Sequence, residues 1–327
     1  MQDVSWLKEY QALTQGAGLV DTAECTQIEF LGEDRASFLH NLCTNEVRKL
    51  PENGGCEAFI TNVQGKTLGH VFIFRSDDLH VVQTVPGQGD LLRQHFEKYL
   101  IRERVEIKDR STGWGQWLLL GKQAEDVLSR TLAKGELPTA NLSSSIALIS
   151  HTPIWIRRTD CLGDIGFMID CLRGDHAHVG TSLKAAGAVD CSHAAYDALR
   201  IEAGFPLFGH DITAQNLPQE VSRNNQTISF TKGCYLGQET VARIDALGHV
   251  NRNLVRLRFL GSQVPPIGAN LLSEDDSVGT VTSAAWSPHF QSPMALGYVR
   301  RGFNTPGTRL TFAADVSEVE VMPLVSA

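Results

Sequence analysis

The chain has 327 residues, of which 42% are hydrophobic and 20% charged, and its formal net charge is −8. This composition excludes a largely disordered chain and allows about two domains, and the lack of any apolar run of roughly 18 residues excludes a membrane-spanning helix. Because the start lacks a basic and apolar leader we expect a cytoplasmic protein, and the acidic balance argues against general binding to nucleic-acid phosphates.

Helical and strand patterns alternate up to residue 203. Apolar residues at helical spacing predict helices at 4–13, 36–42, 91–100, 124–132, 178–186 and 194–203. Strand patterns occur at 26–30, 56–61, 67–74, 79–85, 105–107, 117–120, 154–156 and 165–169. The sequence Asn62-Val63-Gln64-Gly65 lies between two of these strands and predicts a hairpin, whereas residues 137–145 are predicted to form a loop.

The last third of the chain has a different rhythm. Residues 204–235 are punctuated by Gly, Pro and Asn and show little periodicity, and such a long irregular segment is more often functional than accidental. Short strand patterns then recur at 254–259, 277–282, 295–299, 309–312 and 316–321, between Gly and Pro turns. This spacing predicts a small antiparallel β-barrel or sandwich from about residue 250.

The seven cysteines show neither a metal-binding nor a disulfide pattern. No C-x-x-C pair occurs, and a disulfide framework is not expected in a cytosolic chain of this length. Five of them have apolar neighbours and are expected to be small core residues, namely Cys25, Cys43, Cys56, Cys161 and Cys171. We expect no metal site near Cys171, where the sequence indicates a turn that leads into a helix.

Cys234 lies in a segment of a different kind, Lys232-Gly-Cys-Tyr-Leu-Gly-Gln-Glu-Thr-Val-Ala-Arg243. A helix predicted to begin near Gly237 would direct unpaired amide groups back toward the cysteine loop. Such a helix end and the nearby Lys232 both favour a thiolate, so Cys234 is either a reactive thiol or a cysteine that merely occupies a turn.

This segment resembles the K-G-C-[FY]-x-G-Q-E-x-x-[AS]-R signature of the YgfZ family, folate-binding relatives of the glycine-cleavage T-protein. Every specified position is filled. Further blocks similar to these families follow in chain order, at 34–45, 64–66, 200–220, 279–283 and 295–299. The resemblance implies an α+β fold of two interleaved α+β subdomains over residues 1–248, followed by a small antiparallel β-barrel over 249–327, around a central opening.

The resemblance also implies a site for tetrahydrofolate or a derivative. Glu202 matches the glutamate that binds the pterin ring, whose adjacent N–H groups suit one carboxylate, although a surface helix glutamate is the alternative. Arg243 is the candidate for the folate carboxylates or else forms a structural salt bridge. Tyr235 either stacks on the ligand or packs beside the loop, and Gln238 and Glu239 complete the expected cofactor set.

One position departs from the T-protein pattern. T-proteins carry an aspartate just after the hairpin, which aminomethyl transfer uses, but the matching stretch here is Leu68-Gly69-His70-Val71. A carboxylate is therefore missing where that chemistry needs an acid or base. His70 can titrate, although a histidine in a strand is more often structural.

The resemblance therefore implies a tetrahydrofolate-binding accessory protein rather than a conventional enzyme. Such a protein would support the assembly or repair of iron–sulfur enzymes through transient contacts, with Cys234 as the functional thiol and Lys232 beside it. A linked effect on tRNA modification would be indirect, because the net charge is acidic. The alternatives are a folate-dependent one-carbon transferase of the aminomethyl type and direct tRNA binding through arginines of the C-terminal domain.

Overall fold

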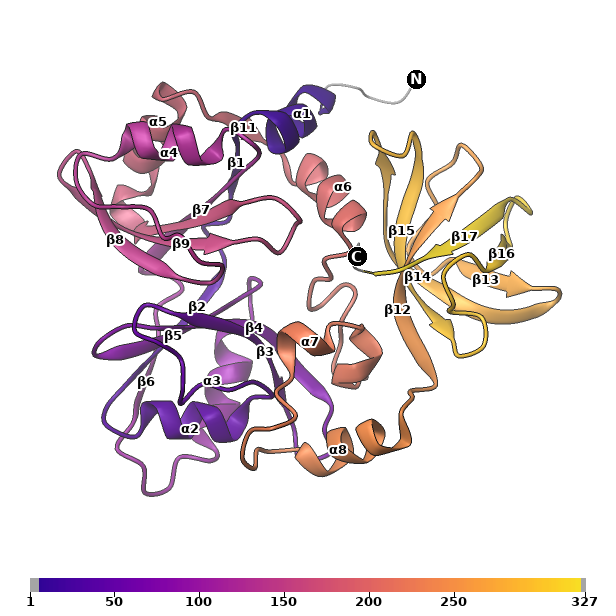
Figure 1. Ribbon diagram of the computed structural model, residues 1–327, viewed down its shortest axis with the longest axis horizontal. Coiled ribbons are helices and arrows are strands. Elements are labelled where there is room, and N and C mark those ends of the chain that lie inside the picture. The colour runs from indigo at the N-terminus through magenta and orange to yellow at the C-terminus, as the bar shows by residue number, and fades with distance from the viewer. Residues whose placement is uncertain (1–5, 325–327) are drawn as a thin grey trace.

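Three β-sheets organise the chain in the computed structural model, which describes residues 6–324 (Figure 1). The first sheet has the strand order β3-β4-β5-β2-β6. Its strands span Gly55–Thr61 (β3), Thr67–Arg75 (β4), Leu79–Thr84 (β5), Thr26–Leu31 (β2) and Glu106–Asp109 (β6). Helices α2 (Arg35–Leu42) and α3 (Gly89–Glu97) cover one face, where the fully buried Phe30, Leu39 and Phe96 belong to one core.

The second sheet has the order β11-β1-β7-β10-β9-β8. Its strands span Val189–Cys191 (β11), Gly18–Asp21 (β1), Trp114–Leu120 (β7), Gly166–Leu172 (β10), Thr152–Thr159 (β9) and Ser144–Ile149 (β8). Helices α4 (Ala124–Thr131) and α5 (His176–Ala185) lie on one side, and α1 (Leu7–Gln15) packs beside α6 (His193–Ala203). The chain enters this sheet with β1, builds the whole first sheet and then returns with β7, so the two subdomains interleave as expected.

A closed six-stranded barrel follows, and it settles the choice between barrel and sandwich. Its order is β12-β15-β14-β13-β16-β17. The strands span Arg252–Phe259 (β12), Ser292–Arg300 (β15), Asp276–Ser287 (β14), Asn270–Ser273 (β13), Arg309–Phe312 (β16) and Glu318–Met322 (β17). Alternate side chains such as Leu257, Phe259, Val319 and Val321 are fully buried inside it, which is the pattern expected where one face of each strand forms the core.

Residues 204–237 connect α6 to α8 (Gln238–Leu247) with only a 3-10 turn at Pro218–Val221 and the short α7 (Asn224–Thr227). The buried Arg200 of α6 orders this segment. Its Nη1 donates to Asp211 Oδ2 at 3.0 Å and its Nη2 to Ser283 Oγ of the barrel at 3.1 Å. The segment forms few regular elements. Its position is set instead by the buried ion pair of Arg200 and Asp211, at the junction with the barrel.

Most predicted elements are present, and the misses are short. The strands β1, β8, β11 and β13 were not expected, and each has six residues or fewer. Residues 4 and 5 of the helix predicted at 4–13 lie outside the described residues. No helix within residues 6–324 is long and apolar enough to cross a bilayer.

A buried polar network joins the two subdomains. Asp170 of the second sheet accepts hydrogen bonds from Gln83 Nε2 of the first sheet, at 3.0 and 3.1 Å, and from Gln116 Nε2 at 2.9 Å. The same carboxylate pairs with the buried guanidinium of Arg157. Because both charges are fully removed from water, each needs the other to remain ionised at tolerable cost.

Two glycines bring the segment that contains Cys234 against the first hairpin. Gly237 has a φ of 82°, and a Cβ there would lie 2.4 Å from Asn62 O and 2.8 Å from the Cα of Gly65. Any side chain would therefore separate α8 from the hairpin loop, so glycine is required both for the left-handed backbone and for the close approach.

We expect Asp170→Asn to lower the free energy of unfolding by about 3–5 kcal/mol, because it leaves the buried Arg157 without a counter-charge. Urea denaturation followed by circular dichroism measures the change. Asp190→Asn is the control, since it removes an exposed carboxylate that pairs with Lys184, and its effect should stay within about 1 kcal/mol. Equal effects of the two variants would contradict the role given to Asp170.

Gly237→Ala should destabilise the chain by more than about 3 kcal/mol, since it adds a backbone collision to the strain of a left-handed residue. Gly248→Ala is matched to it, because Gly248 ends the same helix with a φ of 72° and has open space around its Cα. That control should lose only about 1–2 kcal/mol. The same denaturation measurement compares the two, and a Gly248→Ala variant that is equally unstable would refute the close-approach explanation.

Candidate functional site

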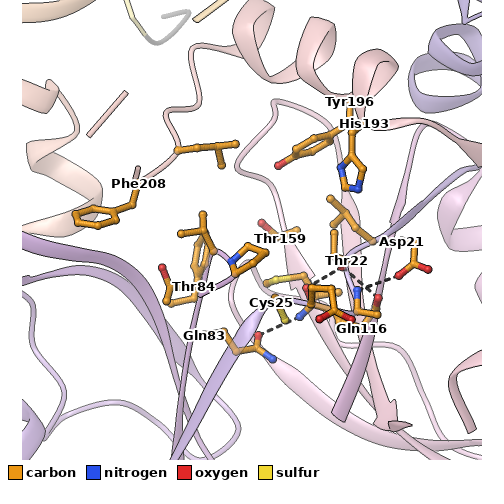
Figure 2. Close-up of a pocket in the computed structure, with 18 of the residues that line it drawn as sticks. Asp21, Thr22, Cys25, Gln83, Thr84, Gln116, Thr159, His193, Tyr196 and Phe208 are labelled. Carbon is orange, nitrogen blue, oxygen red and sulfur yellow. Dashed lines mark hydrogen bonds between the residues drawn. The ribbon is translucent and has the colours of Figure 1, made fainter. Parts of the chain in front are cut away.

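A cavity of about 570 Å³ lies between the two α+β subdomains (Figure 2). Gln83 and Gln116 lie on one side of it with Cys25, whereas Tyr196 and His193 of α6 lie on the opposite side. The amides that hold Asp170 therefore also line the cavity. The irregular segment after α6 contributes a further wall through residues 205–208.

Aromatic rings form much of one wall. Phe72 of β4 and Phe205 are stacked, with ring centroids 6.3 Å apart and an angle of 10° between their planes. Phe208, from the irregular segment after α6, also lines the cavity (Figure 2). Flat apolar surfaces with a few polar groups between them are typical of sites for heteroaromatic ligands.

A second cavity, of about 430 Å³, adjoins the first, because both are lined by Phe72, Thr159 and Cys161. Its lining is more polar and includes Glu57, Glu202 and Arg223. The two cavities together reach from the first subdomain to the barrel, since residues 289–290 of the barrel also line the second one.

Glu202 of α6 lines this second cavity and is only 8% exposed. Its carboxylate accepts hydrogen bonds from Tyr10 Oη at 2.5 Å and from Ser287 Oγ. Burial raises the pKa of Glu202, and the two hydroxyl donors partly oppose this increase. The residue is thus a buried carboxylate at a cavity wall, not an exposed helix glutamate.

His70 also lines the larger cavity, and it is held by a charged pair behind it. Its Nε2 lies 2.6 Å from Glu57 Oε1, and Arg223 donates to both oxygens of Glu57, at 2.6 and 2.7 Å. Burial would raise the pKa of Glu57, but the hydrogen bonds from Arg223 and His70 outweigh it and lower the pKa to about 2. Glu57 is therefore ionised at neutral pH although it is buried.

Lys232 does not extend toward the solvent beside Cys234. Its buried Nζ donates to the carbonyl oxygens of His40, Cys43 and Asn45 at 2.6, 2.8 and 2.7 Å. Burial lowers the pKa of Lys232. An ammonium on these carbonyls favourably complements the C-terminal end of α2, and among residues 6–324 no hydrogen bond joins Lys232 to Cys234. Lys232 thus anchors the loop that carries the thiol.

The other residues of the signature lie outside both cavities. Cys234 is exposed. Tyr235 is buried and packs beside the loop, with Lys232 Nζ 4.9 Å from its ring centroid. The remaining three belong to α8, where Glu239 and Arg243 are exposed and Gln238 is partly buried. The structure therefore does not bring these residues together with Glu202.

Two of the five cysteines that were expected in the core line a cavity instead. Cys43, Cys56 and Cys171 are buried in hydrophobic clusters as predicted. Cys25 and Cys161, however, line the larger cavity, and Cys161 lines both. Burial raises the pKa of each of these two thiols to about 11, so both are protonated at neutral pH. No cluster of His, Cys, Asp or Glu suited to a metal ion occurs within residues 6–324.

Sequence reasoning missed Tyr10, Glu57 and Arg223 as site residues. The sequence does contain a signal for Glu57. It is an acidic residue within the otherwise apolar strand pattern at 56–61, and such a residue requires a buried partner. Arg223 lies in the irregular segment 166 residues away. Its pairing with Glu57 depends on tertiary structure and has no local sequence pattern.

Family models cover most of the chain. Residues 2–229 match the GCVT N-terminal domain, and residues 252–324 match the glycine cleavage T-protein C-terminal barrel domain. An aminomethyltransferase of Symbiobacterium thermophilum is 28% identical over 95% of this chain and 85% of its own length. One from Thermus thermophilus is 27% identical over 94% and 86%, respectively.

A solved structure has the same fold over almost the whole chain. The crystal structure of glycine cleavage system aminomethyltransferase T from Bartonella henselae superposes with a TM-score of 0.89 and is 22% identical in sequence. The match covers 99% of this chain and 90% of that one. Together with the two domain models, which follow one another in the expected order, these findings show that the chain belongs to the glycine cleavage T-protein family.

Proposed function

We propose that this chain binds a reduced folate across the two adjoining cavities. The observation that carries the proposal is the carboxylate of Glu202, which is buried at the wall of the second cavity in a fold shared with aminomethyltransferases. Oε2 of this carboxylate has a single protein donor, and a reduced pterin supplies N–H groups for its remaining acceptor position. The T-protein family binds tetrahydrofolate, which supports this ligand class.

The residues present fit such a ring. Oε2 of Glu202 accepts only the hydroxyl of Tyr10 and retains a further lone pair for a ligand N–H, whereas Oε1 accepts both the hydroxyl of Ser287 and, at 3.5 Å, the amide of His289. Phe72 lines both cavities and stacks on Phe205 of the larger one, so the pair offers a flat apolar wall. Glu202 would therefore orient the pterin ring while the aromatic wall excludes water from it.

We further propose that the chain is an accessory protein of the YgfZ type, which supports iron–sulfur enzymes through the exposed thiol of Cys234. The complete twelve-residue signature and the aspartate missing from the stretch 68–71 support this assignment over glycine cleavage. A single thiol cannot hold a cluster that normally takes four protein ligands, so its contact with partner proteins would be transient. Any effect on tRNA modification would follow from those enzymes.

A folate-dependent one-carbon transferase is the second candidate. It is favoured by the relatives named aminomethyltransferase, which align over most of this chain. Tetrahydrofolate-dependent turnover of a glycine-derived aminomethyl donor would favour this function over the accessory role.

Calorimetric titration with tetrahydrofolate tests the ligand. We expect the wild type to bind, and Glu202→Gln to bind roughly tenfold to a hundredfold more weakly, because an amide replaces the carboxylate that accepts the ligand N–H. Glu29→Gln is the control, since Glu29 is also buried but lines neither cavity, and its affinity should equal that of the wild type. Absence of binding, or an unchanged affinity of Glu202→Gln, would refute the proposed ligand site.

Complementation tests the thiol. Cells that lack the protein receive wild type, Cys234→Ala or Cys191→Ala, and the activities of several iron–sulfur enzymes are measured. We expect Cys191→Ala to restore them and Cys234→Ala to fail, because Cys191 is buried whereas Cys234 is exposed to partners. Immunoblots establish that the variants accumulate equally. Full restoration by Cys234→Ala would eliminate a role for this thiol.

A further inference from the structure

The charged pair behind His70 orients one histidine ring at the wall of the larger cavity. The ring is 7% exposed, and it lies against Phe59, Phe72 and Phe205 at centroid distances of 5.2, 6.2 and 5.7 Å. These contacts and the 2.6 Å approach of Nε2 to Glu57 leave little freedom of rotation. An imidazole fixed in this way is preorganised for a single hydrogen-bonding geometry.

The charge of Glu57 determines which ring nitrogen carries hydrogen. An ionised carboxylate can only accept hydrogen bonds, so Nε2 of His70 must be the N–H that points at Glu57. Nδ1 is then the basic nitrogen of the neutral ring, and no residue within 6–324 hydrogen-bonds to it. Because the cavity is the space that His70 lines, a bound ligand is the available partner for Nδ1.

Arg223 stabilises this arrangement by binding Glu57, and it leaves Nδ1 of His70 unbound. It donates to both carboxylate oxygens of Glu57, and its guanidinium lies 5.0 Å from the ring centroid of Phe205. These two parallel hydrogen bonds fix the orientation of the Glu57 carboxylate, which in turn accepts the hydrogen bond from His70. Removal of Glu57 would therefore leave both a misoriented imidazole and a buried arginine without a partner.

The other charged groups of the cavity are already paired or neutral. His176 lies 3.3 Å from Asp21, and Arg173 lies 3.0 Å from Glu24. The thiols of Cys25 and Cys161 and the hydroxyl of Tyr196 are protonated at neutral pH, because burial raises their pKa values. His193 is exposed. His70 is thus the histidine of the larger cavity that is both buried and backed by an ionised carboxylate.

We propose that His70, Glu57 and Arg223 form an acid–base centre, in which Nδ1 of His70 exchanges a proton with a nitrogen of the ligand in the larger cavity. This inference rests on the proposed binding of a reduced folate. In the forward direction the ligand N–H bond breaks, its electron pair stays on the ligand nitrogen, and the proton forms the second N–H of the imidazole. Glu57 stabilises the resulting imidazolium, and the reverse transfer returns the proton.

Such a centre would give this chain proton-transfer chemistry although the aspartate of aminomethyl transfer is absent. A histidine changes its charge near neutral pH more readily than an aspartate does. The ligand atom served by His70 would be a basic nitrogen of the pterin or its one-carbon substituent. Glu57 and Arg223 act through His70 and are positioning residues.

Nitrogen-15 NMR of histidine-labelled protein tests this centre. The signal of His70 is assigned by its absence from His70→Gln, and His80→Gln provides the control, since His80 is a buried histidine of the same sheet that lines neither cavity. In wild type without ligand we expect Nε2 protonated and Nδ1 unprotonated. Saturation with tetrahydrofolate should shift the Nδ1 resonance toward that of a protonated or hydrogen-bonded nitrogen.

The variants separate this inference from the folate proposal. In Glu57→Gln the ligand-induced Nδ1 shift should be lost or greatly reduced, and in His80→Gln it should equal that of wild type. If Glu57→Gln does not fold, the tautomer and shift in wild type decide the question. Calorimetric binding of tetrahydrofolate with an unmoved Nδ1 resonance would overturn the acid–base centre alone, whereas absence of binding would remove the proposed function on which it rests.

Discussion

The buried carboxylate of Asp170 is the interaction on which the rest of the structure depends. It accepts a hydrogen bond from Gln83 across the boundary between the subdomains, and Gln116 and Arg157 are its other partners. Apolar contacts alone would let two sheets slide or close on one another, whereas an ionised group tolerates only the geometry that satisfies its oxygens. The separation that creates the larger cavity is therefore set by hydrogen-bond directions, and Gln83 and Gln116 line that cavity because they are part of the same shell.

The same device recurs wherever two units meet near the cavities. Arg200 joins Asp211 where α6 approaches the barrel, and Arg223 joins Glu57 where the irregular segment crosses the first sheet. Burial of each pair sacrifices hydration energy that a hydrophobic contact would not lose. These ion pairs therefore fix the relative positions of the units more than they increase the free energy of unfolding. Residues 204–237 can remain largely without regular structure, because their arginines and carboxylates are fixed from outside the segment.

How far the sequence predicts this molecule depends on the range of each interaction. Helices and long strands follow from periodicity, and the closed barrel follows from short strands between Gly and Pro turns. Strands such as β11, with three residues, carry no period and exist only because β1 lies beside them. Glu202 was identified through resemblance, but its hydroxyl partner Tyr10 is 192 residues away. The stretch 68–71 was recognised as a departure, whereas the orientation of His70 by Glu57 and Arg223 required the fold.

The proposed folate pocket and the cysteine loop lie at separate positions. Glu202 and His70 line the interior cavities, while Cys234 is exposed on a loop outside them. Lys232 binds carbonyls at and just after the end of α2, and the amide of Leu236 donates to Asn41 O of the same helix at 2.9 Å. The thiol is therefore exposed on a loop that hydrogen bonds connect to α2, so the proposed partner protein would reach it without opening the cavities. Chemistry on a bound folate and chemistry at the thiol would then be linked through the scaffold of the first subdomain, since β3 and β4 carry Glu57 and His70 and their connecting hairpin contacts Gly237.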